Sequence, residues 1–437
     1  MADSVEISLL SFISICAGDE WNLSDAQVAS ISGAVFGGEL FGSIVWGPLA
    51  DKYGRRVSFL LAYSLITVAG FLTSLAPDFV SLLIFQCMLG FGVAGATVPF
   101  DLLSEFLPAS QRGKFLILIN YFWTIGSLFV AGMAWELLPT KGWRALAFVT
   151  VIPVLLVLLI CYFLLPESPR WLVDKGKMTQ AEAVVKAAAV SNNTPLPDQF
   201  SLTVPIDKLA DEGEDDLLQS IRSLLNRENR VMTFAIWIIW ACFGFGYYGV
   251  VLLISRIYNT GDDDDGMVED DDTCSFDYQS IFLSTLSEGL GILAVQMVIN
   301  SWGRVRSQMF FYFGAAIFVV IYALNVSDEA AIDELLGGTS RGFIMAASAA
   351  TWVAAPELYP TEIRATGHAL SSAIARIGAL LSPYVVLSDI EVTSVGLVLG
   401  AVNLVAVVAV TFTPETAGAA LDKTGGISSG RKPSLSR

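Results

Sequence analysis

The residues of this sequence that could do chemistry are a few charged and aromatic side chains inside long apolar runs. They are Asp3, Glu6, Glu39, Trp123, Glu288 and Arg341. An ionisable side chain within a membrane span costs roughly 2.5–3.5 kcal/mol on insertion scales, so its retention indicates a function by default. We therefore expect these side chains to bind a solute or to couple its movement to a proton.

The first three acids fall in the first two apolar runs. Asp3 and Glu6 are three residues apart and so share one face of a helix, although both could instead be helix-end charges in water. Glu39 lies in the stretch GGELFG, whose glycines permit another helix to approach closely. Its partner is not visible in the sequence, so it either faces a cavity or is neutral.

The remaining three residues lie in later runs. Glu288 is near the middle of its run, and Arg341 is near the outer end of the next run but one. This acid and base could form a switchable pair, clamp a zwitterionic or anionic substrate, or form a satisfied buried pair. Trp123, in FWTIG, could stack on a ring-bearing or cationic substrate, or it could simply pack.

The composition determines which elements position these residues. The chain is 54% hydrophobic and 15% charged, whereas a soluble domain carries about 25% charged residues, so this is a membrane protein. A helix needs about 20 apolar residues to cross a bilayer. Eleven runs of that kind are found, at 27–50, 57–76, 79–102, 115–136, 144–165, 231–254, 279–299, 308–326, 337–358, 366–387 and 393–413.

A twelfth run, at residues 1–16, is short for a span. It carries Asp3 and Glu6 where a signal peptide would carry positive charge, so we interpret it as the outer part of a first helix whose inner end is missing. Most of the 25 Lys and Arg residues fall on one side if the loop DKYGRR is cytoplasmic. Because positive residues are retained on the cytoplasmic side, both termini are expected there.

Two features belong to the opposite, outer side. The stretch DDDDGMVEDDD at 262–272 is typical of a solvated loop, although it could also concentrate cations. Of the five cysteines, Cys16 and Cys274 could form a disulfide, which sequence alone cannot establish because it does not show proximity.

Charged motifs recur at the cytoplasmic ends of the runs. The first half contains GPLADKYGRR, SEFLPASQRGK and PESPR, and the second contains INSWGRVRSQ, PELYPTEIRATG and PETAG. Each motif of the second half follows its counterpart by about 250 residues, which indicates a duplicated six-helix unit. The candidate gate residues in these motifs and beside them are Asp51, Arg55, Arg56, Asp101, Glu105, Arg112, Glu167, Arg170, Arg304, Glu357, Arg364 and Glu415.

These motifs resemble those of the major facilitator superfamily, in its sugar-porter-like branch, and most closely those of the synaptic-vesicle-glycoprotein-related transporters. The resemblance implies an all-α membrane protein with the major facilitator fold, built from two pseudo-symmetric six-helix bundles. The first of the twelve helices is apparently truncated. The bundles would be residues 1–166 and 231–416, with a cytoplasmic linker of short helices at 167–230 and a tail at 417–437.

The resemblance also implies roles for the charged residues. Charges at the helix corners would form ion pairs that lock the outward-open state, with Arg55 and Arg56 meeting Glu105 or Glu167; the alternative is that they only fix topology. In the second half Asn300 replaces Asp51, so a weaker latch is expected there. Asp3 resembles the acidic residue of the first helix that couples proton movement to substrate in related transporters.

The function expected is secondary active transport of a small organic solute by alternating access, without a cofactor and with a proton as coupling ion. The sugar signature QLS is replaced by YYGVVLLIS, which favours an organic ion or small carboxylate over a sugar. P-loop, metal-ligand and nucleophile-elbow motifs are absent from the sequence, which disfavours an enzyme. The alternative is a non-transporting receptor or trafficking protein.

We expect the protein to be a monomer in the plasma membrane or an intracellular vesicle. Its expected partners are the solute and the bilayer, and nucleic acid is not among them.

Overall fold

The computed structural model describes residues 1–106, 112–194, 196–197, 200, 202, 217–259, 274–325, 330–359 and 363–417. The acidic stretch 262–272 and most of the tail therefore lie outside the described residues. The first half contains α1 (Ala2–Trp21), α2 (Asp25–Tyr53), α3 (Arg55–Ser74), α4 (Phe79–Val93), the 3-10 turn η1 (Ala94–Ala96), α5 (Thr97–Phe106) and α6 (Arg112–Leu164).

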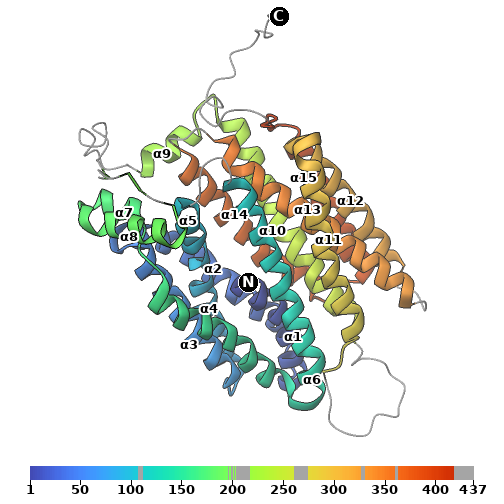
Figure 1. The fold of residues 1–437 in the computed structure, drawn as a ribbon. Helices are drawn as coiled ribbons and strands as arrows, with labels where there is room; N and C mark the ends of the chain where they lie inside the picture. The colour runs from blue at the N-terminus through green and yellow to red at the C-terminus, as the bar shows by residue number, and fades with distance from the viewer. Residues whose placement is uncertain are drawn as a thin grey trace, which may run out of the picture.

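The second half follows three short helices, α7 (Pro169–Asp174), α8 (Met178–Ser191) and α9 (Leu217–Leu224). It contains α10 (Arg230–Ile257), α11 (Tyr278–Trp302), α12 (Arg304–Leu324), α13 (Ala330–Leu358), α14 (Arg364–Val386) and α15 (Val392–Val410). The blue-to-teal helices of the first half and the yellow-to-red helices of the second lie side by side in Figure 1. Among the described residues, nine helices are long and apolar enough to cross a membrane.

Helix α6 contains two of the expected spans. Its 53 residues are interrupted at Gly142, where φ is +71°, a conformation that glycine adopts without the steric penalty of a Cβ. The arms on either side correspond to the runs at 115–136 and 144–165. The expected span at 79–102 is likewise divided, because η1 separates α4 from α5.

The first helix is longer than expected. The run at 1–16 predicts about sixteen residues, but α1 continues for 20 residues to Trp21 and ends at Asn22 in the left-handed conformation. At about 1.5 Å per residue, such a helix is about 30 Å long, close to the thickness of a bilayer core. The sixteen-residue length was wrong because the polar residues 18–20 still lie in helical backbone.

The two halves contact each other along three seams. Helix α2 packs against α14, the first-half helix α6 against α11, and α1 against α10. The Cys16–Cys274 disulfide, which the sequence left open, is formed with Cα atoms 5.1 Å apart. It joins the C-terminal part of α1 to the segment before α11, so the halves are covalently linked.

Candidate functional site

An ion pair is buried between two helices of the second half. Arg341 on α13 donates from Nε to Glu288 Oε1 on α11 at 2.8 Å, and the two side chains are 3% and 0% exposed. The structure therefore brings together the acid and the base that the sequence suggested as partners. A charge taken out of water is tolerated only when it is paired and hydrogen-bonded. Arg341 and Glu288 therefore balance each other's charge inside the second half.

The same carboxylate is linked to the first half. Tyr247 on α10 donates its hydroxyl to Glu288 at 2.9 Å, and the Trp123 indole on α6 donates to the Tyr247 oxygen at 2.5 Å. The Trp123 and Tyr247 rings also meet edge to face at 5.7 Å. The chain from Trp123 to Arg341 thus crosses from one half to the other, and we call it the central network.

A second cluster lies at the seam between α2 and α14. Arg376 on α14 forms ion pairs with Glu39 on α2 at 2.5 Å and with Asp3 on α1 at 3.4 Å. It also donates to the Tyr248 hydroxyl on α10 at 2.9 Å. Gly38 contacts the α4 backbone at Cys87, which leaves Glu39, the next residue, free to face α14. We call these four residues the Arg376 cluster.

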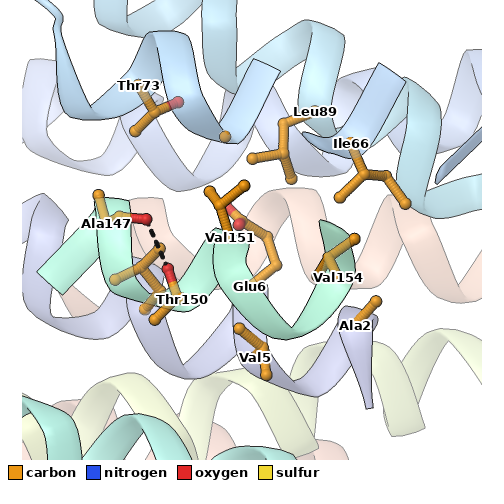
Figure 2. Close-up of a pocket in the computed structure, with 12 residues that line it drawn as sticks. Ala2, Val5, Glu6, Ile66, Thr73, Leu89, Ala147, Thr150, Val151 and Val154 are labelled. Carbon is orange, nitrogen blue, oxygen red and sulfur yellow. Dashed lines mark hydrogen bonds between the residues drawn. The ribbon is translucent and has the colours of Figure 1, made fainter. Parts of the chain in front are cut away.

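Glu6 occupies a separate small cavity inside the first half. Figure 2 shows its side chain pointing from α1 toward Val151 of α6, among Ile66, Leu89 and Val154. Glu6 is 4% exposed, and its Oε1 has no hydrogen-bond partner in the described structure. An unpaired carboxylate in such apolar surroundings is costly, so a protonated carboxyl fits this cavity better than a charged one.

Sequence reasoning missed Arg376 as a site residue. It left Glu39 without a partner, although Arg376 and Arg341 were the only Lys or Arg residues inside the expected spans apart from Arg144, which stands at the first position of one. That rarity was the available signal, because a charge within a span requires a counter-charge. What the sequence did not show is that α2 and α14 are neighbours.

The DKYGRR corner of the first half, between α2 and α3, is built around Glu167. Its Oε1 accepts the backbone N–H groups of Arg55 and Arg56 at 2.8 and 3.1 Å. The Arg55 guanidinium meets Asp51 at 2.5 Å, and Arg56 donates to the Tyr162 carbonyl at 2.6 Å. Glu167 thus holds the start of α3 through backbone N–H groups and not through the arginine side chains, while the expected contact with Glu105 falls on a side chain outside the described part of the structure.

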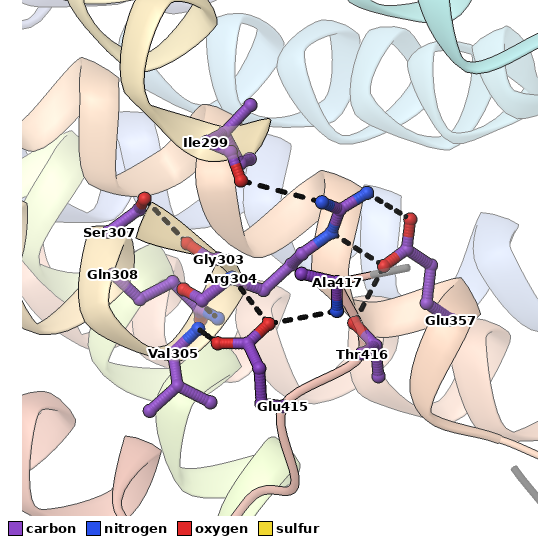
Figure 3. A network of polar contacts seen from close by, with 10 residues as sticks. All are labelled: Ile299, Gly303, Arg304, Val305, Ser307, Gln308, Glu357, Glu415, Thr416 and Ala417. Atoms are coloured by element: carbon purple, nitrogen blue, oxygen red, sulfur yellow. Dashed lines mark hydrogen bonds and ion pairs between the residues drawn. The ribbon is translucent and has the colours of Figure 1, made fainter. Parts of the chain in front are cut away.

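The second half repeats this corner (Figure 3). Glu415 accepts the backbone N–H groups of Arg304 and Val305 at 2.8 and 3.1 Å. The Arg304 guanidinium forms a bidentate pair with Glu357 at 2.7 and 2.8 Å. A weaker latch was expected because Asn300 stands where the first half has Asp51, but the Arg304 guanidinium has Glu357 of α13 as its acid.

Glu415 lies beyond the last span, and its titration is shifted by its surroundings. Partial burial alone would raise the pKa of its carboxyl, but the backbone N–H donors of Arg304, Ala417 and Val305 outweigh burial and hold the pKa below the usual range. The carboxylate is therefore ionised in the folded corner at neutral pH.

The other gate candidates are less informative. The side chains of Asp101, Glu105, Arg112 and Arg364 lie outside the described part of the structure. Arg170 is exposed on α7 and forms no ion pair with a described residue. Each described corner is held by the acid that follows the last long helix of the same half. These contacts therefore do not cross between the halves.

Comparison with known proteins was made on sequence and on structure. The profile of the family described as sugar (and other) transporter matches residues 7–425. The putative transporter svop-1 of Caenorhabditis elegans is 34% identical over 88% of this chain and 74% of its own length. The organic cation/carnitine transporter 7 of Arabidopsis thaliana is 30% identical over 93% and 85%, and the synaptic vesicle 2-related protein of Xenopus laevis is 32% identical over 97% and 78%.

Solved structures of one transporter have the same fold. The inward-open xylose transporter XylE of Escherichia coli superimposes with a TM-score of 0.70 over 97% of both chains, at 18% identity. XylE bound to 6-bromo-6-deoxy-D-glucose superimposes with a TM-score of 0.63 at 21% identity. The likeness extends over nearly the entire chain.

Proposed function

Because the chain belongs to the sugar (and other) transporter family and is a multi-pass membrane protein of the major facilitator fold, we propose that it moves a small organic solute by alternating access, coupled to a proton. The observation that carries this proposal is the central network, which connects Trp123 of the first half to the buried Glu288–Arg341 pair of the second. A solute bound there would touch both halves, as alternating access requires.

The chemistry of the central network favours a charged solute. The Arg341 guanidinium and the Glu288 carboxylate are buried 2.8 Å apart. In a low-dielectric site each can exchange its partner for a ligand group that carries the same charge as that partner. Arg341 would take a ligand carboxylate, Glu288 a ligand cation, and the Trp123 face could stack on either. An organic ion or small carboxylate therefore fits better than a sugar, and one relative is named as an organic cation/carnitine transporter.

Proton coupling is proposed from the buried carboxyls of the first half. Glu6 has an oxygen without a hydrogen-bond partner, and Glu39 and Asp3 depend on a single arginine for their ion pairs. Buried carboxyls of this kind change protonation when a neighbouring charge moves. No cofactor is invoked, since the proton gradient supplies the driving force.

The proposed topology places both termini in the cytoplasm. The Cys16–Cys274 disulfide lies at the opposite end of the helices from the DKYGRR corner, and disulfides persist outside the reducing cytosol. Relatives named for synaptic vesicles favour an intracellular vesicle over the plasma membrane. The protein is proposed to act as a monomer.

Uptake by proteoliposomes tests the proposal. Purified protein would be reconstituted and given carnitine, choline, nicotinate or xylose, with and without an inward proton gradient. We expect uptake of a charged compound that depends on the gradient and is lost in Glu288→Gln and Arg341→Gln. The exposed Glu136→Gln, on the outer part of α6, is the matched control and should transport normally. Uptake of xylose alone would overturn the proposed solute class, and uptake indifferent to the gradient would overturn proton coupling.

A further inference from the structure

The Arg376 cluster links α14 to three other helices, α1 and α2 of the first half and α10 of the second, through one guanidinium. Arg376 forms ion pairs with Glu39 on α2 and with Asp3 on α1, and it donates a hydrogen bond to Tyr248 on α10 of its own half. The Arg376 side chain is 9% exposed and that of Glu39 is 0% exposed. The central network and this cluster meet through the rings of Tyr247 and Tyr248, whose centroids are 5.4 Å apart, but among the described residues no hydrogen bond or ion pair joins them. The ion pairs of Arg376 are therefore not accounted for by solute binding at Glu288 and Arg341.

Glu39 and Arg376 lie near the middle of α2 and α14, and the two helices remain in contact toward their outer ends. Tyr384, two turns beyond Arg376 on α14, packs over Gly33 on α2, where an added Cβ would be 3.0 Å from the tyrosine oxygen. The Phe36 and Tyr248 rings pack together at 4.8 Å beside the pair. Separation of α2 from α14 on the outer side therefore has to break the Glu39–Arg376 ion pair.

The protonation state of Glu39 decides how difficult that separation is. Pulling apart a buried ion pair leaves two uncompensated charges, which is strongly unfavourable. Arginine keeps its proton under all ordinary conditions, so only the carboxyl can be neutralised. Once Glu39 is protonated, Arg376 still has Asp3 and Tyr248 as partners, and α2 carries no charge at the seam.

The other ionisable groups around the pair do not offer Glu39 a second cation. They are Asp3, Glu6 and the amino group of Met1 at α1, Tyr63 on α3, and Tyr248 on α10. Asp3 and Glu6 are acids and cannot pair with the Glu39 carboxylate, and the Met1 amino group lies beside Asp3. Arg376 is the one described guanidinium that holds Glu39 in its charged form.

We propose that Arg376 is a positioning residue that couples protonation of Glu39 to the separation of α2 from α14 on the outer side of the protein. The proposal rests on the proton-coupled transport proposed above and adds the place where the proton acts on the conformation. It requires one proton to be bound each time the seam opens.

Hydrogen–deuterium exchange of the protein in nanodiscs, without any solute, tests this coupling. Amide exchange rates in the outer parts of α2 and α14 would be measured over a series of pH values and divided by the intrinsic rate at each pH. If opening binds one proton, the opening equilibrium rises up to about tenfold for each unit by which pH falls. In Glu39→Gln, the amides of α2 and α14 should exchange fast at every pH. The opening equilibrium should then not depend on pH, because the glutamine is neutral throughout.

Three further variants keep the result interpretable. Arg376→Lys retains a cation and should keep the pH slope, whereas Arg376→Gln should lose it, which a merely structural role would not predict. Glu136→Gln removes an exposed carboxyl on α6 and should leave the slope at α2 and α14 unchanged. A wild-type seam without a slope, or a slope that persists in Glu39→Gln and Arg376→Gln, would overturn the inference. Because no solute is present, these outcomes are independent of whether the uptake experiment succeeds.

Discussion

The Glu415 carboxylate accepts the backbone N–H of Arg304 at 2.8 Å across a separation of 111 residues. Glu167 and Arg55 have the same relationship, at the same distance and a separation of 112 residues. In each case the acid follows the last long helix of its half and secures the corner between the second and third. The duplicated motifs of the sequence thus produce the same backbone contact twice.

The glycines at these corners should not tolerate a side chain. Gly54 and Gly303 have φ values of +108° and +86°, and a Cβ at either would collide with the carboxylate of Glu167 or Glu415. Gly54→Ala and Gly303→Ala should each lower stability by about 1–3 kcal/mol, seen as a lower thermal midpoint by tryptophan fluorescence. Gly47→Ala is the control, because Gly47 is helical with open space around it. Equal midpoints for all three variants would contradict the strain argument.

The Glu415 corner should give stability a dependence on acid pH. Its pKa is lower in the folded protein than in the unfolded chain, so its contribution is complete above the unfolded value of about 4.3 and is lost as pH falls through the folded value. Glu415→Gln should lower the thermal midpoint at neutral pH and flatten its decline in acid. The exposed Glu391→Gln should leave both unchanged. The prediction fails if the Glu415→Gln and wild-type profiles run parallel.

The buried Glu288–Arg341 pair should behave as a unit. Glu288→Gln or Arg341→Gln leaves one buried charge without its partner, which costs about 3–5 kcal/mol for a pair this deeply buried. The double variant leaves no unpaired charge and should recover part of that loss. Thermal midpoints of the four proteins, measured at one pH in one detergent, form the double-mutant cycle. Additive losses would show that the two side chains do not interact.

The disulfide can be checked by alkylation and mass spectrometry. In denatured, unreduced protein, iodoacetamide should modify Cys87, Cys161 and Cys242, and it should reach Cys16 and Cys274 only after reduction. Replacing both disulfide cysteines by serine should lower stability by about 2–4 kcal/mol because the unfolded chain regains freedom. Modification of all five cysteines without reductant would refute the disulfide.

The sequence predicted the helices well where apolar runs are uninterrupted. The runs at 231–254 and 279–299 became α10 and α11, with ends shifted by only a few residues. Helix α1 was underestimated because Asp19 and Glu20 resemble a loop in composition, yet their backbone is helical. Local polarity does not decide where a helix ends when its final turn reaches water.

The candidate site was predicted in part. Glu288 and Arg341 were chosen because intramembrane charges are rare, and the structure pairs them. The same reasoning did not find the partner of Glu39, since Glu39 and Arg376 lie in different halves of the chain and their contact depends on how the halves pack. The two corners could be located from their motifs, but not that backbone N–H groups would be the donors.

The Cys16–Cys274 bond also limits how the two halves can move. It fastens α1 to the chain four residues before α11, and a fully extended segment of that length spans about 14 Å. The seam between α2 and α14 has no such fastening among the described residues, only the Glu39–Arg376 pair and the packing around it. In the alternating-access cycle proposed above, outward opening with the bond intact would therefore be asymmetric, hinged beside the disulfide and widest between α2 and α14.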